Sequence, residues 1–200
     1  MIAGRACGSQ LKRRLESLGG FSLIELVIVV SLVLIVGSMV ASTFRISPIR
    51  RVENMAHQLA AHLELARTDA LNNRHKGRVV FDSTGSSYTA YVDHDDDDSI
   101  TEVAAEAIAF QAFGTRRLQD LVIFGRGAAA KIPGDAGDGG ITLTSDELNL
   151  SEQGFPEPWG TMGTIYLVHE RDNTAVAAIS VASSGSFKAW RWWPDPGEWR

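Results

Sequence analysis

The chain has 200 residues, a hydrophobic content of 44% and a net charge of −5. This length suits one ordinary domain and a membrane element, and excludes two full domains. Residues 1–20 hold four of the 19 basic and one of the 24 acidic residues, so the remainder carries a net charge of −8. An acidic domain is a poor partner for nucleic acid. The single cysteine, Cys7, leaves no disulfide framework after residue 20.

The N-terminal region has a basic segment, then Gly19-Gly20, and only then a long apolar segment. From Leu26 to Phe44 the 19 residues are uncharged, and a helix needs roughly 20 apolar residues to cross a bilayer. In a secretory signal peptide the small-residue cleavage site follows the apolar core. Here cleavage after Gly20 would leave the apolar helix on the mature chain, with a new amine on Phe21. We expect a transmembrane helix over residues 21–44.

Glu25 is the one charge near the start of this apolar segment. A carboxylate there costs a few kcal/mol of insertion free energy, about 3 kcal/mol on lenient scales. The presence of Glu25 at this position therefore indicates a function. Glu25 lies four residues after Phe21, which places the carboxylate and the new amine on one helix face. In an assembly, Glu25 would pair with the amine of a neighbouring subunit and neutralise two charges in an apolar core. The alternative is a plain signal anchor with a stray glutamate.

The basic leader ending in Gly20, followed by Phe21-Ser-Leu-Ile-Glu25, resembles the type IV prepilin signature. The resemblance implies that a prepilin peptidase cuts between Gly20 and Phe21 and methylates the amine of Phe21. It also implies assembly through Glu25, and a single-pass inner-membrane protein with its C-terminal domain in the periplasm, later part of a pilus-like fibre. Charge alone decides the orientation poorly, because basic residues lie close to both ends of the apolar segment.

A second helix is predicted after the apolar segment, within residues 45–75. Ser47-Pro48 is typical of an N-cap with proline in the first helical position, and marks a kink or a restart. The helix should end near Asn72-Asn73. Its histidines, His57 and His62, fall on different faces and are expected to face solvent. Apolar residues recur at spacings of three and four, which predicts a helix lying along a sheet: Ile49, Val52, Met55, Ala56, Leu59, Leu63, Ala66 and Ala70.

Residues 76–200 are predicted to form a β-rich domain. Residues 77–81 and 88–92 indicate a hairpin, and the stretch from Gly127 to Gly140 indicates a long loop that is open to motion. The fold class is therefore α+β, with a long hydrophobic N-terminal helix, as in pilins, and an antiparallel sheet packed on the second helix. Further strands are expected at 107–112, 121–124, 141–144, 164–169, 176–181 and 187–192.

The order of these elements resembles the GspH/FimT family of pilin-like proteins. The matching residues are Ala66-Arg-Thr-Asp-Ala70, Tyr91-Val-Asp93, Gln153-Gly154, Gly163-Thr-Ile165, and Ile179-Ser-Val181 with Gly185. The resemblance implies a minor pseudopilin of a type II secretion system, or a minor type IV pilin of the FimT type. Its implied partners are other pseudopilins or pilins, the prepilin peptidase and the inner membrane.

The segment from Asp93 to Glu102 is the most charged part of the chain. Asp93, Asp95 and Asp97 have the alternating spacing that opens a calcium loop, but Asp98 occupies the position where an EF-hand needs glycine. A looser Ca²⁺ site completed by Glu102 stays open as an interpretation. A solvated acidic loop is the favoured one.

The C-terminal residues from Phe187 to Arg200 interleave aromatic residues with cations. Aromatic stacking and cations together can bind single-stranded nucleic acid, and Lys188 and Arg191 would be the contacts. DNA-uptake pilins of the FimT type imply a Gly-Arg-x-Arg motif here, whereas this chain has Gly185-Ser-Phe-Lys188. Nucleic-acid binding is therefore the disfavoured interpretation, and tryptophans packed on the sheet or against a neighbouring subunit are favoured.

The sequence has no Gly-x-Ser-x-Gly elbow, no phosphate-binding loop and no histidine pair at metal-ligand spacing. We therefore expect a structural subunit without catalytic residues. A signal-anchored periplasmic enzyme is the remaining alternative, and Gly20-Phe21 with Glu25 disfavours it.

Overall fold

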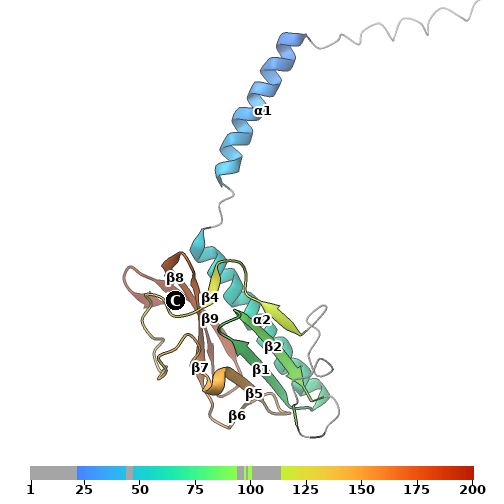
Figure 1. Cartoon of the computed structure of the whole chain (residues 1–200), viewed down its shortest axis with the longest axis vertical. Helices are drawn as coiled ribbons and strands as arrows, with labels where there is room; N and C mark the ends of the chain where they lie inside the picture. The colour runs from blue at the N-terminus through green and yellow to red at the C-terminus, as the bar shows by residue number, and fades with distance from the viewer. Residues whose placement is uncertain (1–21, 44–46, 94–96, 98, 101–113) are drawn as a thin grey trace, which may run out of the picture. The chain divides into compact units, whose positions relative to one another are not determined.

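The computed structural model describes residues 22–43, 47–93, 97, 99–100 and 114–200. The chain divides into two units, Met1–Arg45 and Ile46–Arg200. The first unit contributes helix α1, Leu23–Thr43, with Glu25 in its first turn. The second unit contributes helix α2 and two antiparallel sheets (Figure 1). Among the described residues, no helix is both long enough and apolar enough to cross a membrane.

Helix α2, Pro48–Asn73, confirms the prediction for this segment. Ser47 occupies the N-cap position with extended backbone and Pro48 follows it, as expected of a first helical position. Arg74 ends the helix in the left-handed conformation, and the next amide, that of His75, donates to the carbonyl of Ala70 at 3.1 Å. The buried side chains are seven of the eight predicted ones: Val52, Met55, Ala56, Leu59, Leu63, Ala66 and Ala70.

The first sheet has the strand order β3-β2-β1-β5-β6. The predicted hairpin is confirmed: β1 pairs with β2 from Gly77↔Val92 to Asp82↔Ser87. The Asp82 carboxylate caps its turn by accepting from the amides of Thr84 and Gly85. The strands are β1 Gly77–Asp82, β2 Ser87–Val92, β3 Thr115–Arg117, β5 Glu147–Leu150 and β6 Pro156–Glu157.

The second sheet has the strand order β10-β9-β8-β7-β4. Strand β4 pairs with β7, although β5 and β6 of the first sheet lie between them in the sequence. The chain therefore enters the second sheet at β4, returns to the first sheet at β5 and β6, and enters the second sheet again at β7. The prediction of one sheet was therefore wrong in this respect, because strand pairing over such separations is invisible to local patterns. The strands are β4 Val122–Phe124, β7 Gly163–His169, β8 Asp172–Val181, β9 Phe187–Trp193 and β10 Glu198–Trp199.

One predicted strand needs correction, and another lies outside the described residues. Residues 141–144 do not form a strand: Ile141 makes a single bridge to Ile165, and a short 3-10 helix, Thr144–Asp146, follows. The chain must turn there to deliver β5 to the first sheet, and Ser145 and Asp146 adopt positive φ in that turn. The strand expected at 107–112 lies outside the described residues.

The main core lies between α2 and both sheets. Leu59 and Leu63 of α2 join Val79 of the first sheet and Ile165 of the second in one buried cluster. Alternate residues of β7 and β8 point the other way, where Tyr166 and neighbouring side chains form two smaller clusters under the loop after β4 and under β10. The central strands of the second sheet are thus buried on both faces, which explains their continuous apolar sequence.

Candidate functional site

Helix α1 is the first candidate site, because it carries Glu25. The described side chains of α1 are almost all aliphatic and exposed, from Leu23 to Val36. Ser31 satisfies its hydroxyl within the helix by donating to the carbonyl of Val27 at 2.7 Å. Glu25 is exposed in the first turn, where a negative charge complements the helix dipole. Gly20 and Phe21 lie outside the described residues, so the predicted cleavage site stays a prediction.

The predicted acidic loop is described only in part. Asp93 is buried at the end of β2, where its amide donates to the carbonyl of Lys76 at 3.0 Å. Asp97 is exposed, and its carboxylate accepts from the amide of Ser99 at 2.9 Å. Asp95 and Glu102 lie outside the described residues. No cluster of three metal-ligating side chains occurs among the residues described, and the calcium interpretation remains a prediction.

The C-terminal strands place their cations on opposite faces of the second sheet. Lys188 lies over the Trp190 ring at 3.6 Å from the ring centroid. Arg191 instead stacks on Trp193 and pairs with Glu53 of α2 at 3.4 Å. The two residues predicted as nucleic-acid contacts are therefore not brought together, and the charge of Arg191 is compensated by the helix.

Three tryptophans of this region, Trp190, Trp192 and Trp199, close the outer face of the second sheet. Trp192 is buried, with Trp199 packed against it at 5.3 Å between ring centroids. Trp199 also donates from its indole nitrogen to the carbonyl of Ala130 at 2.9 Å, which ties β10 to the loop after β4. Trp190 donates to the hydroxyl of Ser180 at 2.9 Å. These three side chains pack as the favoured interpretation expects.

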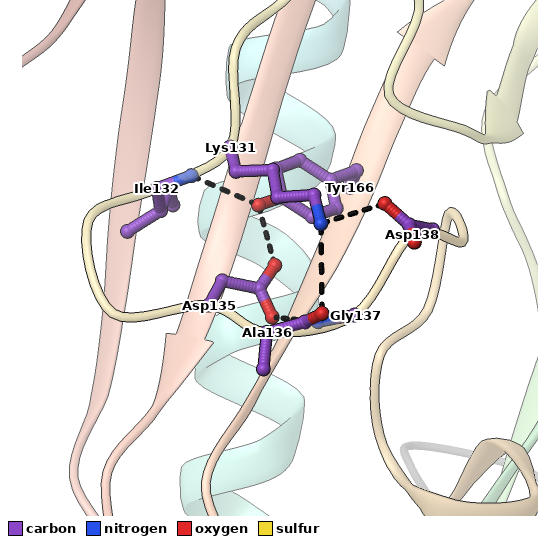
Figure 2. Close-up of polar contacts among 7 residues, drawn as sticks. All are labelled: Lys131, Ile132, Asp135, Ala136, Gly137, Asp138 and Tyr166. Atoms are coloured by element: carbon purple, nitrogen blue, oxygen red, sulfur yellow. Dashed lines mark hydrogen bonds and ion pairs between the residues drawn. The ribbon is translucent and has the colours of Figure 1, made fainter.

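The loop from Gly127 to Gly140, expected to be open to motion, is also held to the sheet by Tyr166 (Figure 2). Tyr166 of β7 donates its hydroxyl hydrogen to Asp135 at 2.6 Å and accepts from the amide of Ile132 at 3.0 Å. Burial, together with the hydrogen bond to Asp135, raises the pKa of Tyr166 to about 12, so the hydroxyl stays protonated and can donate at any ordinary pH.

A second layer of contacts closes the same loop on itself. The amide of Gly137 donates to the other oxygen of Asp135 at 3.3 Å. Lys131 donates to the carbonyl of Ala136 at 3.5 Å and pairs with Asp138 at 2.6 Å (Figure 2). This hydrogen-bonded ion pair lowers the pKa of Asp138. The aspartates and glycines of this sequence thus form a closed turn rather than a linker.

Three short motifs from distant parts of the chain meet at the end of α2. Arg67 donates from Nε to the carbonyl of Gly154 at 2.9 Å, and its terminal nitrogen lies 3.5 Å from Glu64. Gly185 sits against the same carbonyl, because a Cβ built there would lie 2.5 Å from the Gly154 oxygen. The sequence singles out each motif separately, but only the structure shows that they form one junction.

One histidine departs from its prediction. His57 is exposed as expected, whereas His62 is partly buried and shares a 2.6 Å hydrogen bond between its Nδ1 and the hydroxyl of Tyr88. Burial, with the nearby charge of Arg116, lowers the pKa of His62. Burial also raises the pKa of Tyr88 to about 12. A helical wheel places His62 at the border of the apolar face but cannot show that a tyrosine lies opposite it.

Comparisons with known proteins find similarity only among solved structures. No family model and no curated protein matches the sequence. In structure the chain is similar to the minor pseudopilin EpsH from the type 2 secretion system of Vibrio cholerae, with 12% identity, 74% of this chain and 99% of that chain covered, and a TM-score of 0.49. It is also similar to the type IV minor pilin FimU of Pseudomonas aeruginosa, with 14% identity, 70% and 87% covered, and a TM-score of 0.44. The similarity concerns the fold alone.

Proposed function

We propose that this chain is a minor pseudopilin, a structural subunit of a type II secretion pseudopilus. It is made with a leader of residues 1–20, cut and N-methylated at Phe21 by a prepilin peptidase, and held in the inner membrane by residues 21–44. Its domain then lies in the periplasm. The observation that supports this most is the coincidence of Gly20-Phe21 and Glu25 with an apolar helix whose described side chains are nearly all exposed.

An exposed helix that is apolar on all sides needs other apolar surfaces to cover it. Lipid supplies them before assembly, and the same helix of neighbouring subunits supplies them afterwards. Glu25 then has a partner of opposite charge, the amine of Phe21 in an adjacent subunit. Partnering matters because an unpaired carboxylate in an apolar helix bundle costs several kcal/mol, about 3 to 5 when one member of a buried pair is removed.

The second unit gives the subunit its role outside the helix bundle. It has its own buried core formed by α2 and both sheets, so its outer surface is available for other subunits or for cargo. An alternative within the same architecture is a minor type IV pilin of the FimT type that takes part in DNA uptake. Lys188 stacked on Trp190 is the feature that would favour it. A filter-binding assay at low salt separates the two, because only the DNA-uptake pilin should retain single-stranded DNA on the filter.

Leader processing tests the core of the proposal. Co-expression with a prepilin peptidase should shorten the chain by 20 residues and leave an N-methylated Phe21, measured by intact-mass spectrometry. Gly20→Ala should abolish the cleavage, whereas Gly19→Ala, one residue away from the cut, should be processed normally. Normal processing of Gly20→Ala, or a chain that is never cut, would contradict the proposal.

Glu25→Ala tests the assembly step separately. The variant should be inserted and cleaved like the native chain, since neither step needs the carboxylate. It should form fewer crosslinks with the other pseudopilins when these are co-expressed. Ser31→Ala on the same helix is the matched control, because its hydroxyl bonds only to its own helix. Equal crosslinking of both variants would show that Glu25 has no part in assembly.

A further inference from the structure

A row of polar side chains crosses the outer face of the first sheet. Arg78 of β1 lies opposite Asn149 of β5, and Asn149 lies opposite Glu157 of β6. Residues directly opposite one another on neighbouring strands project from the same face. Their chain neighbours Val79, Leu148 and Pro156 are buried, so this row points away from the core. On the other side of β1 the row continues to Tyr91, which lies opposite Arg78.

A cavity of about 490 Å³ lies along this row. Arg78, Asn149 and Glu157 line it, together with Lys76 just before β1 and Trp159 just after β6. Arg78 is fixed in place, because its Nε donates to the Asn149 side chain at 3.0 Å and lies 3.8 Å from Glu147. The size falls within the range of small-ligand sites, and the polar groups are held in a defined geometry as such sites require.

Trp159 forms one wall of this cavity and is the most exposed large apolar side chain of the second unit among the residues described, at 77%. Two contacts hold the turn that presents it. Thr161 donates its hydroxyl to the carbonyl of Pro158 at 2.6 Å, and Phe155 packs edge-on against the indole at 5.4 Å between centroids. An exposed indole held by such contacts offers a flat apolar platform for a ligand.

The charges of the cavity indicate which ligands suit it. Two cations, Lys76 and Arg78, line or border it together with two carboxylates, Glu147 and Glu157. Glu147 borders the cavity without lining it, and when it is counted these four described groups are balanced in formal charge, so together they give no net attraction to an anionic ligand. The same groups supply both hydrogen-bond donors and acceptors in a row. A neutral ring compound rich in hydroxyls uses both kinds of group, and its apolar C–H face fits an indole.

We propose that this cavity binds a short neutral saccharide, with one sugar ring stacked on Trp159 and the hydroxyls bonded to Arg78, Asn149 and Glu157. Neighbouring strands lie about 4.8 Å apart, so the part of the row that lines the cavity, from β1 to β6, spans roughly 10 Å. This length accommodates a saccharide of a few units lying across the strands. The site is independent of leader processing and of assembly through α1.

The test is calorimetric titration of the full chain in micelles of lauryldimethylamine oxide, a detergent without a sugar head group. The probes are cellotriose, mannotriose and chitotriose, with trigalacturonate as an anionic counterpart. At least one neutral probe should bind with a dissociation constant near or below about 1 mM, which corresponds to roughly 4 kcal/mol. Trp159→Ala should weaken binding tenfold or more, and Glu157→Gln should weaken it by a smaller factor.

Met162→Ala is the matched control, because Met162 is also exposed, at 65%, on the same turn but lines a different cavity. It should bind the saccharide like the native chain. Urea unfolding shows whether each variant is folded. No heat from any of the three neutral probes overturns the proposal, as does equal binding by the Trp159 and Met162 variants, or binding of trigalacturonate alone. Protection of Trp159 from oxidation by a partner subunit, with no effect of saccharides, would instead assign this surface to a protein interface.

Discussion

At the residue scale, the junction of Arg67, Gly154 and Gly185 shows why replacing certain glycines of this chain should lower its stability. Both glycines have positive φ, of 74° and 78°. Gly185 has a further constraint, because the Gly154 carbonyl and the Arg67 side chain occupy the space that a Cβ would need. The turn before β9 and the turn after β5 thereby approach the end of α2 closely enough for Arg67 to bond to one of them.

Gly185→Ala is expected to destabilise the second unit more than Gly160→Ala. Gly160 has a φ of 90°, but a Cβ added there would meet nothing within 4 Å, so its replacement costs only the strain of the left-handed backbone, about 1 kcal/mol. Gly185 adds the contact with the Gly154 oxygen and should lose at least about 2 kcal/mol in total, because backbone strain and a steric clash add together. Urea unfolding of both variants measures the difference. Equal losses would mean that the junction relaxes without cost.

The His62–Tyr88 pair predicts a pH dependence of stability. The pKa of His62 is lowered in the folded chain by burial and by Arg116, so the folded state binds the proton less well than the unfolded state does. The contribution of the His62–Tyr88 pair to the free energy of unfolding is therefore complete above the pKa of His62 in the unfolded chain, near 6.5. This contribution is lost as the pH falls from there through the pKa of His62 in the folded chain.

His62→Gln should remove this contribution. The native chain should lose more unfolding free energy than the variant between pH 7.5 and pH 5, measured by urea unfolding at both values. His57→Gln is the control, because His57 is exposed on the same helix, and it should follow the native chain. A native-like pH dependence in the His62 variant would assign the effect to other groups.

At the scale of elements, one strand residue orders a long loop. Tyr166 lies on the outer face of β7, where the loop after β4 covers it, and its hydroxyl bonds both to Asp135 and to the amide of Ile132. Glycine- and aspartate-rich composition is typical of mobile loops, yet here the aspartate side chain accepts from the sheet and from the loop. A mobile loop and this loop can have the same composition, and the difference here is that Asp135 bonds to a buried partner, Tyr166.

Tyr166→Phe should release this loop without disturbing the sheet. The ring keeps its packing, but the buried amide of Ile132 and the carboxylate of Asp135 lose their partner, at a cost of about 1 to 3 kcal/mol. Hydrogen exchange should rise across residues 131–138 and stay unchanged in β7 and β8. Lys131→Met is the control, since it removes an exposed ion pair with Asp138 and a 3.5 Å hydrogen bond to the carbonyl of Ala136, but leaves both hydrogen bonds of Tyr166 in place. Similar exchange in both variants would deny Tyr166 this role.

At the scale of the whole molecule, the second unit is a helix shared by two sheets. Helix α2 contacts β1 and β2 of the first sheet and β7, β8 and β9 of the second. The two sheets therefore depend on the same apolar face of α2 for their burial. Such a common core makes independent unfolding of either sheet unfavourable.

A fragment of residues 46–200 should fold alone and unfold in one cooperative step. Its fluorescence and far-UV circular dichroism transitions in urea should coincide, and its midpoint should match that of the second unit within the full chain in detergent micelles. The physical reason is that the core contains no described side chain from the first unit. Two separate transitions, or a fragment that remains unfolded, would contradict this view.

The sequence by itself determined the elements whose signals are local. The apolar repeat and the Ser47-Pro48 start defined α2, and alternation with a turn defined the β1–β2 hairpin, because helix periodicity and hairpin pairing act over a few residues. The cleavage site after Gly20 and the assembly role of Glu25 rest on residue order alone, and they stay predictions.

Only the tertiary structure decided the features that join distant residues. These are the division into two sheets with β4 beside β7, the burial of His62 against Tyr88, the anchoring of the loop by Tyr166, and the row from Arg78 to Glu157 beside Trp159. In each case the residue type was visible in the chain, but its partner lay tens of residues away. The cost of closing such long loops is met by burial that only the assembled core provides, and no local pattern records it.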